Sequence, residues 1–208
     1  MKKILSIIGL PISLMLFSTS AHAQNAGQLK MGLNYSYGLP MGSFKNDLIQ
    51  NGSARGFNGE IMYGINKQFS VGLSVGYQNF YQKEGRAVYQ TGDHQATSAV
   101  LSNSITTVPV LAKATFLPLK GNTVVQPYIS LGAGVSFNNY DQYLGVFGGT
   151  DNQTSFAAEG GLGIHVPFGK WSTSGLNLGA QYNYINYDKF GYKNFNNISL
   201  QAGVYFPL

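Results

Sequence analysis

The chain has 208 residues, a formal net charge of +5 and no cysteine, and only 10% of its residues are charged. A chain of this length forms one domain, and the absence of cysteine excludes a disulfide framework. The basic excess is small and scattered, so it gives no argument for a nucleic-acid partner. Roughly a quarter or more of a water-facing surface consists of charged residues, so this composition disfavours an ordinary soluble domain.

The N-terminal segment predicts export. A pair of lysines opens the chain, an apolar run extends to Phe17, and a small-residue cleavage motif ends at Ala23. We expect residues 1–23 to be a signal peptide and residues 24–208 to form a single β-barrel domain. An uncleaved membrane anchor is the alternative, but the run is short for a ~20-residue span and Pro11 interrupts it.

Eight later segments alternate between large apolar residues and small or polar ones. This period of two is typical of strands whose two faces meet different surroundings. The segments cover about residues 29–39, 57–65, 69–78, 107–116, 125–137, 158–166, 176–185 and 198–208. We interpret the polar stretch between the third and fourth segments as a long loop with room for extensions of the flanking strands.

The clearest pattern is a hairpin over residues 57–78, with its turn at residues 66–68. One row of its side chains is large and apolar, and the other is small and polar with Glu60 as its only charge. Gly, Ser, Asn and Gln make a poor surface for water but a good lining for a narrow interior. We therefore predict an inside-out barrel, with apolar side chains facing lipid and polar ones facing the lumen.

Eight antiparallel strands close into an up-and-down barrel without a free edge, which a membrane requires because unpaired backbone groups are costly in lipid. The first, third, fifth and seventh connections are longer than the others. Outer-membrane barrels have long extracellular loops and short periplasmic turns, so we expect both termini in the periplasm. Aromatic residues such as Tyr37, Tyr77, Trp171 and Phe206 lie near the strand ends, as in membrane-interface belts.

Ionisable residues on the predicted inward rows form the main candidate site. An eight-stranded barrel has room for side chains but not for a water channel, and a buried charge needs a partner. The inward ionisable residues are Lys30, Glu60, Lys113, Glu159 and His165. We hypothesise that Lys113, with Lys30 as a second candidate cation, neutralises Glu60 and Glu159. The polar residues expected to complete the hydrogen bonds are Gln126, Tyr128, Gln181 and Tyr205.

The sequence contains no strong catalytic pattern. His94 lies beside Asp93 and near Ser98, which is more typical of a solvated loop tip than of a hydrolytic site. His165 is followed two positions later by Pro167, where lipid A deacylase barrels carry the serine of a His-x-Ser pair. Glycosidase-like carboxylate pairs, Cys/His metal sets and phosphate-binding loops are also missing. We expect no enzymatic activity, no cofactor and no metal.

Four segments carry a resemblance to a known family. They are GLPMGSF (Gly38–Phe44), GEIMYGINKQFSVGLSVGY (Gly59–Tyr77), PYISLGAGVSF (Pro127–Phe137) and the terminal ISLQAGVYFPL. Essentially the whole mature chain resembles the small outer-membrane β-barrel proteins of Gram-negative bacteria, the OmpX/OmpW/porin-like family. The segments encode strand alternation rather than a site. The terminal strand departs from the pattern, because the assembly signal usually ends on an aromatic residue and here Pro207 and Leu208 follow Phe206.

The resemblance implies envelope structure, surface adhesion or small-molecule passage, and contacts with outer-membrane lipid and the barrel-assembly machinery. We favour a monomeric structural or surface-interaction barrel. Its outer loops offer candidate contacts to an unknown surface ligand: Tyr81, Arg86, Tyr89, His94, Tyr140, Tyr143 and Phe147. A narrow porin-like channel for small solutes is the alternative. A soluble periplasmic ligand-binding β-barrel is the second alternative, which the almost uncharged second face disfavours.

Overall fold

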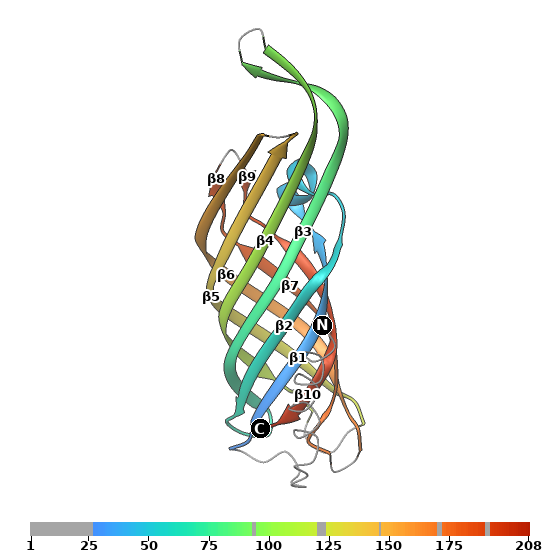
Figure 1. Cartoon of the computed structure of the whole chain (residues 1–208). Helices are drawn as coiled ribbons and strands as arrows, with labels where there is room; N and C mark the ends of the chain where they lie inside the picture. Colours follow the sequence, from blue (N-terminus) through green and yellow to red (C-terminus); the bar gives the residue numbers. More distant parts are fainter. Residues whose placement is uncertain (1–26, 93–94, 120–123, 146, 170–171, 190–191) are drawn as a thin grey trace, which may run out of the picture.

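Eight strands of the computed structural model close into one barrel (Figure 1). The structure describes residues 27–92, 95–119, 124–145, 147–169, 172–189 and 192–208. The barrel strands are β1 (Leu29–Pro40), β2 (Ser53–Gly64), β3 (Phe69–Gly92), β4 (Gln95–Phe116), β5 (Gln126–Leu144), β6 (Phe147–Pro167), β7 (Gly175–Ile185) and β10 (Asn197–Pro207). Consecutive strands pair antiparallel, and β1 pairs with β10 to close the ring. The predicted eight-stranded up-and-down barrel is confirmed.

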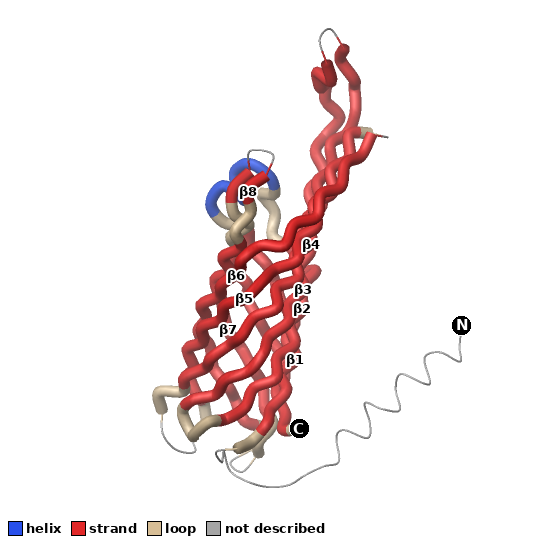
Figure 2. The backbone as a smooth tube through the Cα atoms, turned by 90° about the vertical axis from the view of Figure 1, so that its left-hand side faces the viewer, coloured by secondary structure: helices blue, strands red, loops and turns tan. Residues whose placement is uncertain are grey.

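Two small elements lie in the connections at one end of the barrel. A short π-helix, η2 (Phe44–Leu48), lies between β1 and β2. The two-residue strands β8 (Asp188–Lys189) and β9 (Tyr192–Lys193) form a hairpin between β7 and β10. Figure 2 shows these elements together at the end of the barrel from which the longest hairpin projects. No helix in the described part of the chain is long and apolar enough to cross a membrane.

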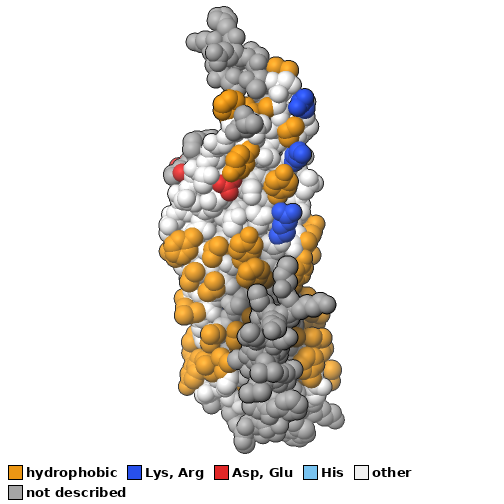
Figure 3. Space-filling view, viewed as in Figure 1, with side chains coloured by type: hydrophobic (Ala, Val, Ile, Leu, Met, Phe, Trp, Pro, Cys, Tyr) orange, Lys and Arg blue, Asp and Glu red, His pale blue; other side chains and the backbone are white. Residues whose placement is uncertain are grey.

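The two faces of the strands have the predicted inside-out arrangement. Phe57 exposes 60% of its surface on the outer wall, whereas the next residue, Asn58, exposes 5%. The same contrast separates Leu73, 61% exposed, from Ser74, 1% exposed. Figure 3 shows hydrophobic side chains spread over the lower part of the outer wall. The polar rows therefore line the lumen, and the barrel offers an apolar band to its surroundings.

The strands continue well beyond the predicted membrane segments. β3 and β4 pair as far as Gly92 and Gln95. Most of the long loop predicted between the third and fourth segments is therefore a β-hairpin, which stands above the rest of the barrel (Figures 1 and 2). β5 and β6 likewise pair through the connection between the fifth and sixth predicted segments. Outside a membrane the outer face of a strand meets water instead of lipid, so the outward apolar row fades although the backbone ladder continues. We call β3–β4 residues 79–106 and β5–β6 residues 138–156 the outer sheet.

The opposite end of the barrel carries the short connections. The backbone N–H of Leu208 donates to the carbonyl of Leu29, and Leu29 is in register with Tyr63. The start of β1, the end of β10 and the β2–β3 turn therefore lie at one end. The signal peptide predicted over residues 1–23, His94 and Trp171 lie outside the described residues.

Candidate functional site

The centre of the lumen holds an ion triad formed by Lys113, Glu60 and Glu159. The Lys113 Nζ atom lies 3.0 Å from Glu60 Oε2 and 3.1 Å from Glu159 Oε1. The side chains come from β4, β2 and β6 and expose only 4%, 12% and 2% of their surface. A buried ammonium and carboxylate lose hydration worth several kcal/mol per ion, so each of the three depends on its partners. One cation thus links three separate strands across the lumen.

Glycines opposite the carboxylates make room for this triad. Gly32 faces Glu60 across the β1–β2 ladder, and Gly132 faces Glu159 across the β5–β6 ladder. A Cβ atom at either glycine would lie 2.8 Å from the Cγ atom of the facing glutamate. The sequence predicts small residues along the lumen but does not assign them to particular charges, since strand register decides that pairing.

Polar neighbours extend the triad along the lumen. Gln181 on β7 donates from Nε2 to Glu159 Oε2 at 3.3 Å. Gln126 is buried on β5 and is in register with His165 on β6. The Glu159 carboxylate therefore accepts a hydrogen bond from the neutral Gln181 side chain in addition to its contact with the Lys113 ammonium.

Lys30 and His165 lie apart from the triad. They pack with Tyr128 and Tyr205 in what we call the aromatic layer. The expectation of Lys30 as a second cation for the glutamates does not match the geometry. Its Nζ atom lies 5.7 Å from the centroid of the Tyr205 ring, and the ion pairs found among the described residues all involve Lys113. The reason is register, because Lys30 pairs with Met62 rather than with Glu60. His165 stacks against Tyr128, with a centroid separation of 4.5 Å, and lies 4.8 Å from Tyr205.

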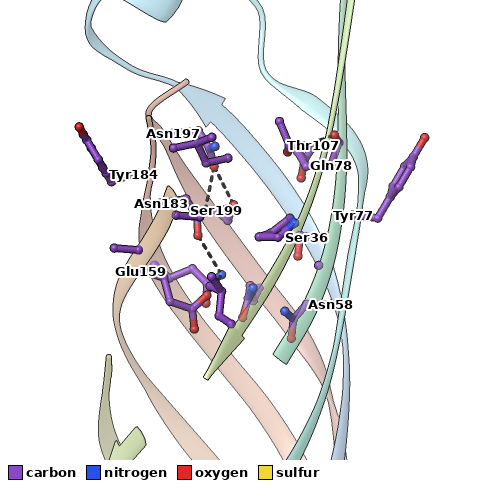
Figure 4. Close-up of a pocket in the computed structure, with 18 of the residues that line it drawn as sticks. Ser36, Asn58, Tyr77, Gln78, Thr107, Glu159, Asn183, Tyr184, Asn197 and Ser199 are labelled. Atoms are coloured by element: carbon purple, nitrogen blue, oxygen red, sulfur yellow. Dashed lines mark hydrogen bonds between the residues drawn. The ribbon is translucent and has the colours of Figure 1, made fainter. Parts of the chain in front are cut away.

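Two small cavities lie on either side of the triad. The cavity towards the outer sheet has a volume of about 30 Å³ and includes Glu159 in its wall. Figure 4 shows its remaining polar lining, with Ser36, Asn58, Gln78 and Thr107 facing Asn183, Asn197 and Ser199. The other cavity, of about 50 Å³, is lined by Glu60, Lys113 and the aromatic layer. Each volume accommodates a few water molecules, not a larger solute.

An apolar plug closes the lumen beyond the upper cavity. Phe44 of η2 packs edge-on against Phe80 of β3 at 5.1 Å and lies 5.2 Å from Phe195. Tyr187 stacks on Phe195 at 4.0 Å, so the β1–β2 and β7–β10 connections both reach into the barrel mouth. The buried cluster contains Phe44, Leu48, Ile49, Phe80, Ile105, Leu111, Tyr140, Ala157, Ile185, Tyr187 and Phe195. The sequence does not predict this plug, because Pro40, Gly42 and Asn46 are typical of a loop and give no sign of inward packing.

Tyr187 has a specific polar contact at the edge of this plug. Its hydroxyl donates to Asp151 Oδ2 at 3.3 Å. Burial and the neighbouring Asp151 carboxylate raise the pKa of Tyr187 to about 12. The neutral phenol is therefore favoured in the folded protein.

The predicted surface-contact residues divide into exposed and buried ones. Tyr81, Arg86, Tyr143 and Phe147 are exposed on strands of the outer sheet rather than on loops. Tyr140 is wrongly predicted: it is 5% exposed, its hydroxyl donates to Asn103 Oδ1 at 3.1 Å, and it belongs to the apolar plug. The alternation of β5 simply continues past the membrane segment and turns Tyr140 inward. The Tyr89 side chain and His94 lie outside the described residues.

Comparison with known proteins agrees with this architecture. The family model "Outer membrane protein beta-barrel domain" matches residues 11–206. The chain belongs to this family. No curated protein matches the sequence. Membership places the barrel in the outer membrane, and together with the exposed apolar band it argues against the soluble periplasmic alternative.

Solved structures of outer-membrane barrels match this chain at low sequence identity. OprG from Pseudomonas aeruginosa is 15% identical, with a TM-score of 0.54 over 89% of this chain and 98% of that chain. Neisserial surface protein A is 18% identical, with a TM-score of 0.49 over 90% of this chain and 100% of that chain. Outer Membrane Protein W of E. coli is 13% identical, with a TM-score of 0.48 over 89% of this chain and 100% of that chain. At this identity the likeness to OprG supports the fold alone.

Proposed function

We propose that this protein is a monomeric outer-membrane barrel that is closed to solutes and acts through its outer surface. The observation that carries the proposal is the ion triad, in which Lys113 bridges Glu60 and Glu159 across the lumen. The apolar plug is a second closure in series, beyond the upper cavity. A solute crossing the barrel has to displace both.

The lengths of the connections support the orientation that we propose for the barrel. The outer sheet and plug lie at one end, and the short β2–β3 turn and both strand termini lie at the other. In outer-membrane barrels the longer loops are extracellular. The outer sheet then faces the outside of the cell, and both termini are periplasmic after removal of residues 1–23 by signal peptidase.

The lumen offers no arrangement for covalent chemistry in the described residues. His165 lies between two tyrosine rings, and the carboxylates are engaged by Lys113. A general base needs a substrate proton within hydrogen-bond reach, and cavities of this size do not admit a substrate. We therefore propose a structural and surface-interaction role without catalysis.

Planar-bilayer recording tests the closed lumen. We expect the refolded full-length barrel to show no unitary conductance steps in 1 M KCl. The matched variant Lys67→Gln changes a charge on the exposed β2–β3 turn and should be equally silent. Reproducible steps from the wild-type protein would refute the closed barrel and support the narrow channel.

The two water-sized cavities are the observation that favours such a channel. They lie on opposite sides of the triad, with Glu159 in one wall and Glu60 and Lys113 in the other. If the triad is the only barrier, the triple variant Glu60→Gln, Lys113→Met and Glu159→Gln should open a conductance. We expect that variant to stay silent, because the apolar plug remains.

Shortening the outer sheet tests the surface role. Replacing residues 84–101 by a two-residue Asn-Gly turn removes the projecting hairpin but keeps Phe80 and Ile105 in the plug. We expect the barrel to fold, as shown by its altered gel mobility before boiling. Cells producing it should adhere less to cultured epithelial cells than cells producing the full chain. Equal adhesion, at equal surface levels of both proteins, would contradict a surface-contact role for the hairpin.

A further inference from the structure

We infer that a row of cations on the outer wall binds the phosphorylated headgroups of glycolipids in the surrounding outer leaflet. This cation row consists of Arg55 on β2 and Lys83 and Arg86 on β3, all of them exposed. Among the described residues none of the three forms an ion pair. Figure 3 shows Lys and Arg side chains in a line on the upper wall, with hydrophobic side chains between them. The inference goes beyond the proposed function, because it concerns lipids beside the barrel and does not depend on the closed lumen.

The row begins directly above the apolar band. Phe57 and Tyr77 stack on the outer wall with ring centroids 5.1 Å apart, as in an aromatic belt at a membrane boundary. Arg55 is two residues further along β2, which is about 7 Å along a strand. Its Nη1 atom lies 3.4 Å from Asn79 Oδ1, and its guanidinium lies 5.9 Å from the centroid of the Tyr81 ring. The guanidinium is thus held on the outer wall at the depth where lipid headgroups begin.

A β-bulge aligns the upper two cations. Side chains alternate along a strand, so residues three apart, such as Lys83 and Arg86, normally point to opposite faces. Here Lys83 pairs with Ser102 and Arg86 pairs with Val100, so β3 contains one extra residue. The bulge returns Arg86 to the face that carries Lys83, which is a known use of bulges. Glu84 is the exposed acid beside the row, which leaves an excess of positive charge.

The heights of the cations favour a glycolipid over a phospholipid. Lys83 lies six residues beyond Tyr77, or about 20 Å along the strand, and Arg86 lies further out. A phospholipid carries its phosphate at one depth, whereas a phosphorylated glycolipid presents anionic groups at several heights. The small cross-strand partners Ser104 and Ser102 leave the face beside Tyr81 and Lys83 open. The geometry therefore fits a tall, anionic headgroup lying against the wall.

Binding of fluorescent lipopolysaccharide to the folded barrel in detergent micelles tests this inference. A cation near an anionic lipid surface contributes about fivefold in affinity. We expect Lys83→Gln with Arg86→Gln to weaken binding roughly twenty-fivefold, and added salt to weaken the wild type most. The matched control is Lys45→Gln with Lys67→Gln, which removes the same charge from exposed positions off the row. Equal weakening of binding in both double variants would refute a binding site at the cation row.

A second variant keeps the net charge and moves only its position. Arg86→Ala with Ala87→Arg carries the guanidinium to the other face of the hairpin, and we expect about fivefold weaker binding. Unchanged binding would refute the role of the bulge. Equal binding of dephosphorylated lipopolysaccharide would refute phosphate recognition. Full competition by inorganic phosphate at matched phosphate concentration would show a soluble-anion site and overturn the lipid assignment. Gel mobility before boiling verifies that each variant is folded.

Discussion

The two halves of β3 turn side chains of opposite polarity towards the inside of the barrel. In the membrane half, residues 69–78, the inward side chains are polar, as at Ser74, and the outward ones are apolar, as at Leu73. In the outer half, residues 79–92, the apolar Phe80 points inward and is fully buried, and the charged Lys83 points outward. One continuous strand thus changes its partition between Gln78 and Phe80.

The same change occurs on neighbouring strands. On β4 the inward residue is Thr107 in the membrane half and Ile105 in the outer half. On β5 the inward series passes from Asn138 to Tyr140. The physical reason is the medium outside the wall. Lipid requires an apolar exterior and leaves the polar side chains to pair inside, whereas water solvates a polar exterior and favours an apolar interior.

The largest expected effect removes the cation of the membrane half. Lys113→Met leaves Glu60 and Glu159 buried without their cation, and we expect a loss of about 3–5 kcal/mol in the free energy of unfolding. Urea unfolding of the barrel in detergent micelles measures this loss. The triple variant that also carries Glu60→Gln and Glu159→Gln should recover most of it, because no charge is then left unpaired. If Lys113→Met left the free energy of unfolding unchanged, the triad would contribute no stability.

The outer wall offers a matched pair of substitutions on β3. Leu73→Arg places a charge midway along the lipid-facing row and should cost about 2–4 kcal/mol. Tyr81→Arg makes a similar change where the wall faces water and should cost no more than about 1 kcal/mol, which covers the lost contact between the Tyr81 ring and the Arg55 guanidinium. Reversible unfolding in phospholipid vesicles compares the two. Equal costs would contradict the boundary that we place between Gln78 and Phe80.

A glycine substitution tests the space around the triad. Gly132→Ala brings a Cβ atom to 2.8 Å from Glu159 Cγ and should destabilise the barrel by about 1–3 kcal/mol through overpacking. Gly160→Ala is the matched control, because its Cβ meets Leu131 Cδ2 at 3.7 Å, an ordinary contact. The urea midpoints of both variants give the comparison. Two equal shifts would indicate a backbone effect rather than crowding of the carboxylate.

The smallest expected effect concerns pH and the apolar plug. Tyr187→Phe keeps the ring but removes one hydrogen bond, which costs about 1 kcal/mol at neutral pH. The pKa of Tyr187 is raised to about 12 from an unfolded value near 10, so its neutral form stabilises the fold fully below pH 10. That contribution is lost between about pH 10 and 12. Wild-type stability should fall more steeply than that of Tyr187→Phe in this window, and parallel curves would contradict the assignment.

Local alternation is enough to predict the fold class and the lipid-facing side of each strand. Phe57 and Leu73 are readable as outward-facing because lipid imposes a strict apolar alternation on every membrane strand. The need of Glu60 for a cation was also predictable, since a charge in a narrow lumen cannot remain alone.

How these parts meet depends on the closed barrel and cannot be predicted from one strand at a time. Closure of the ring and strand register bring Lys113 to both glutamates and place Lys30 over Tyr205 instead. The burial of Tyr140 and the face of Arg86 likewise depend on where the ladder continues and where a bulge interrupts it. Beyond the membrane the surroundings no longer impose one pattern on each strand, so contacts between distant segments, rather than local alternation, determine what is buried.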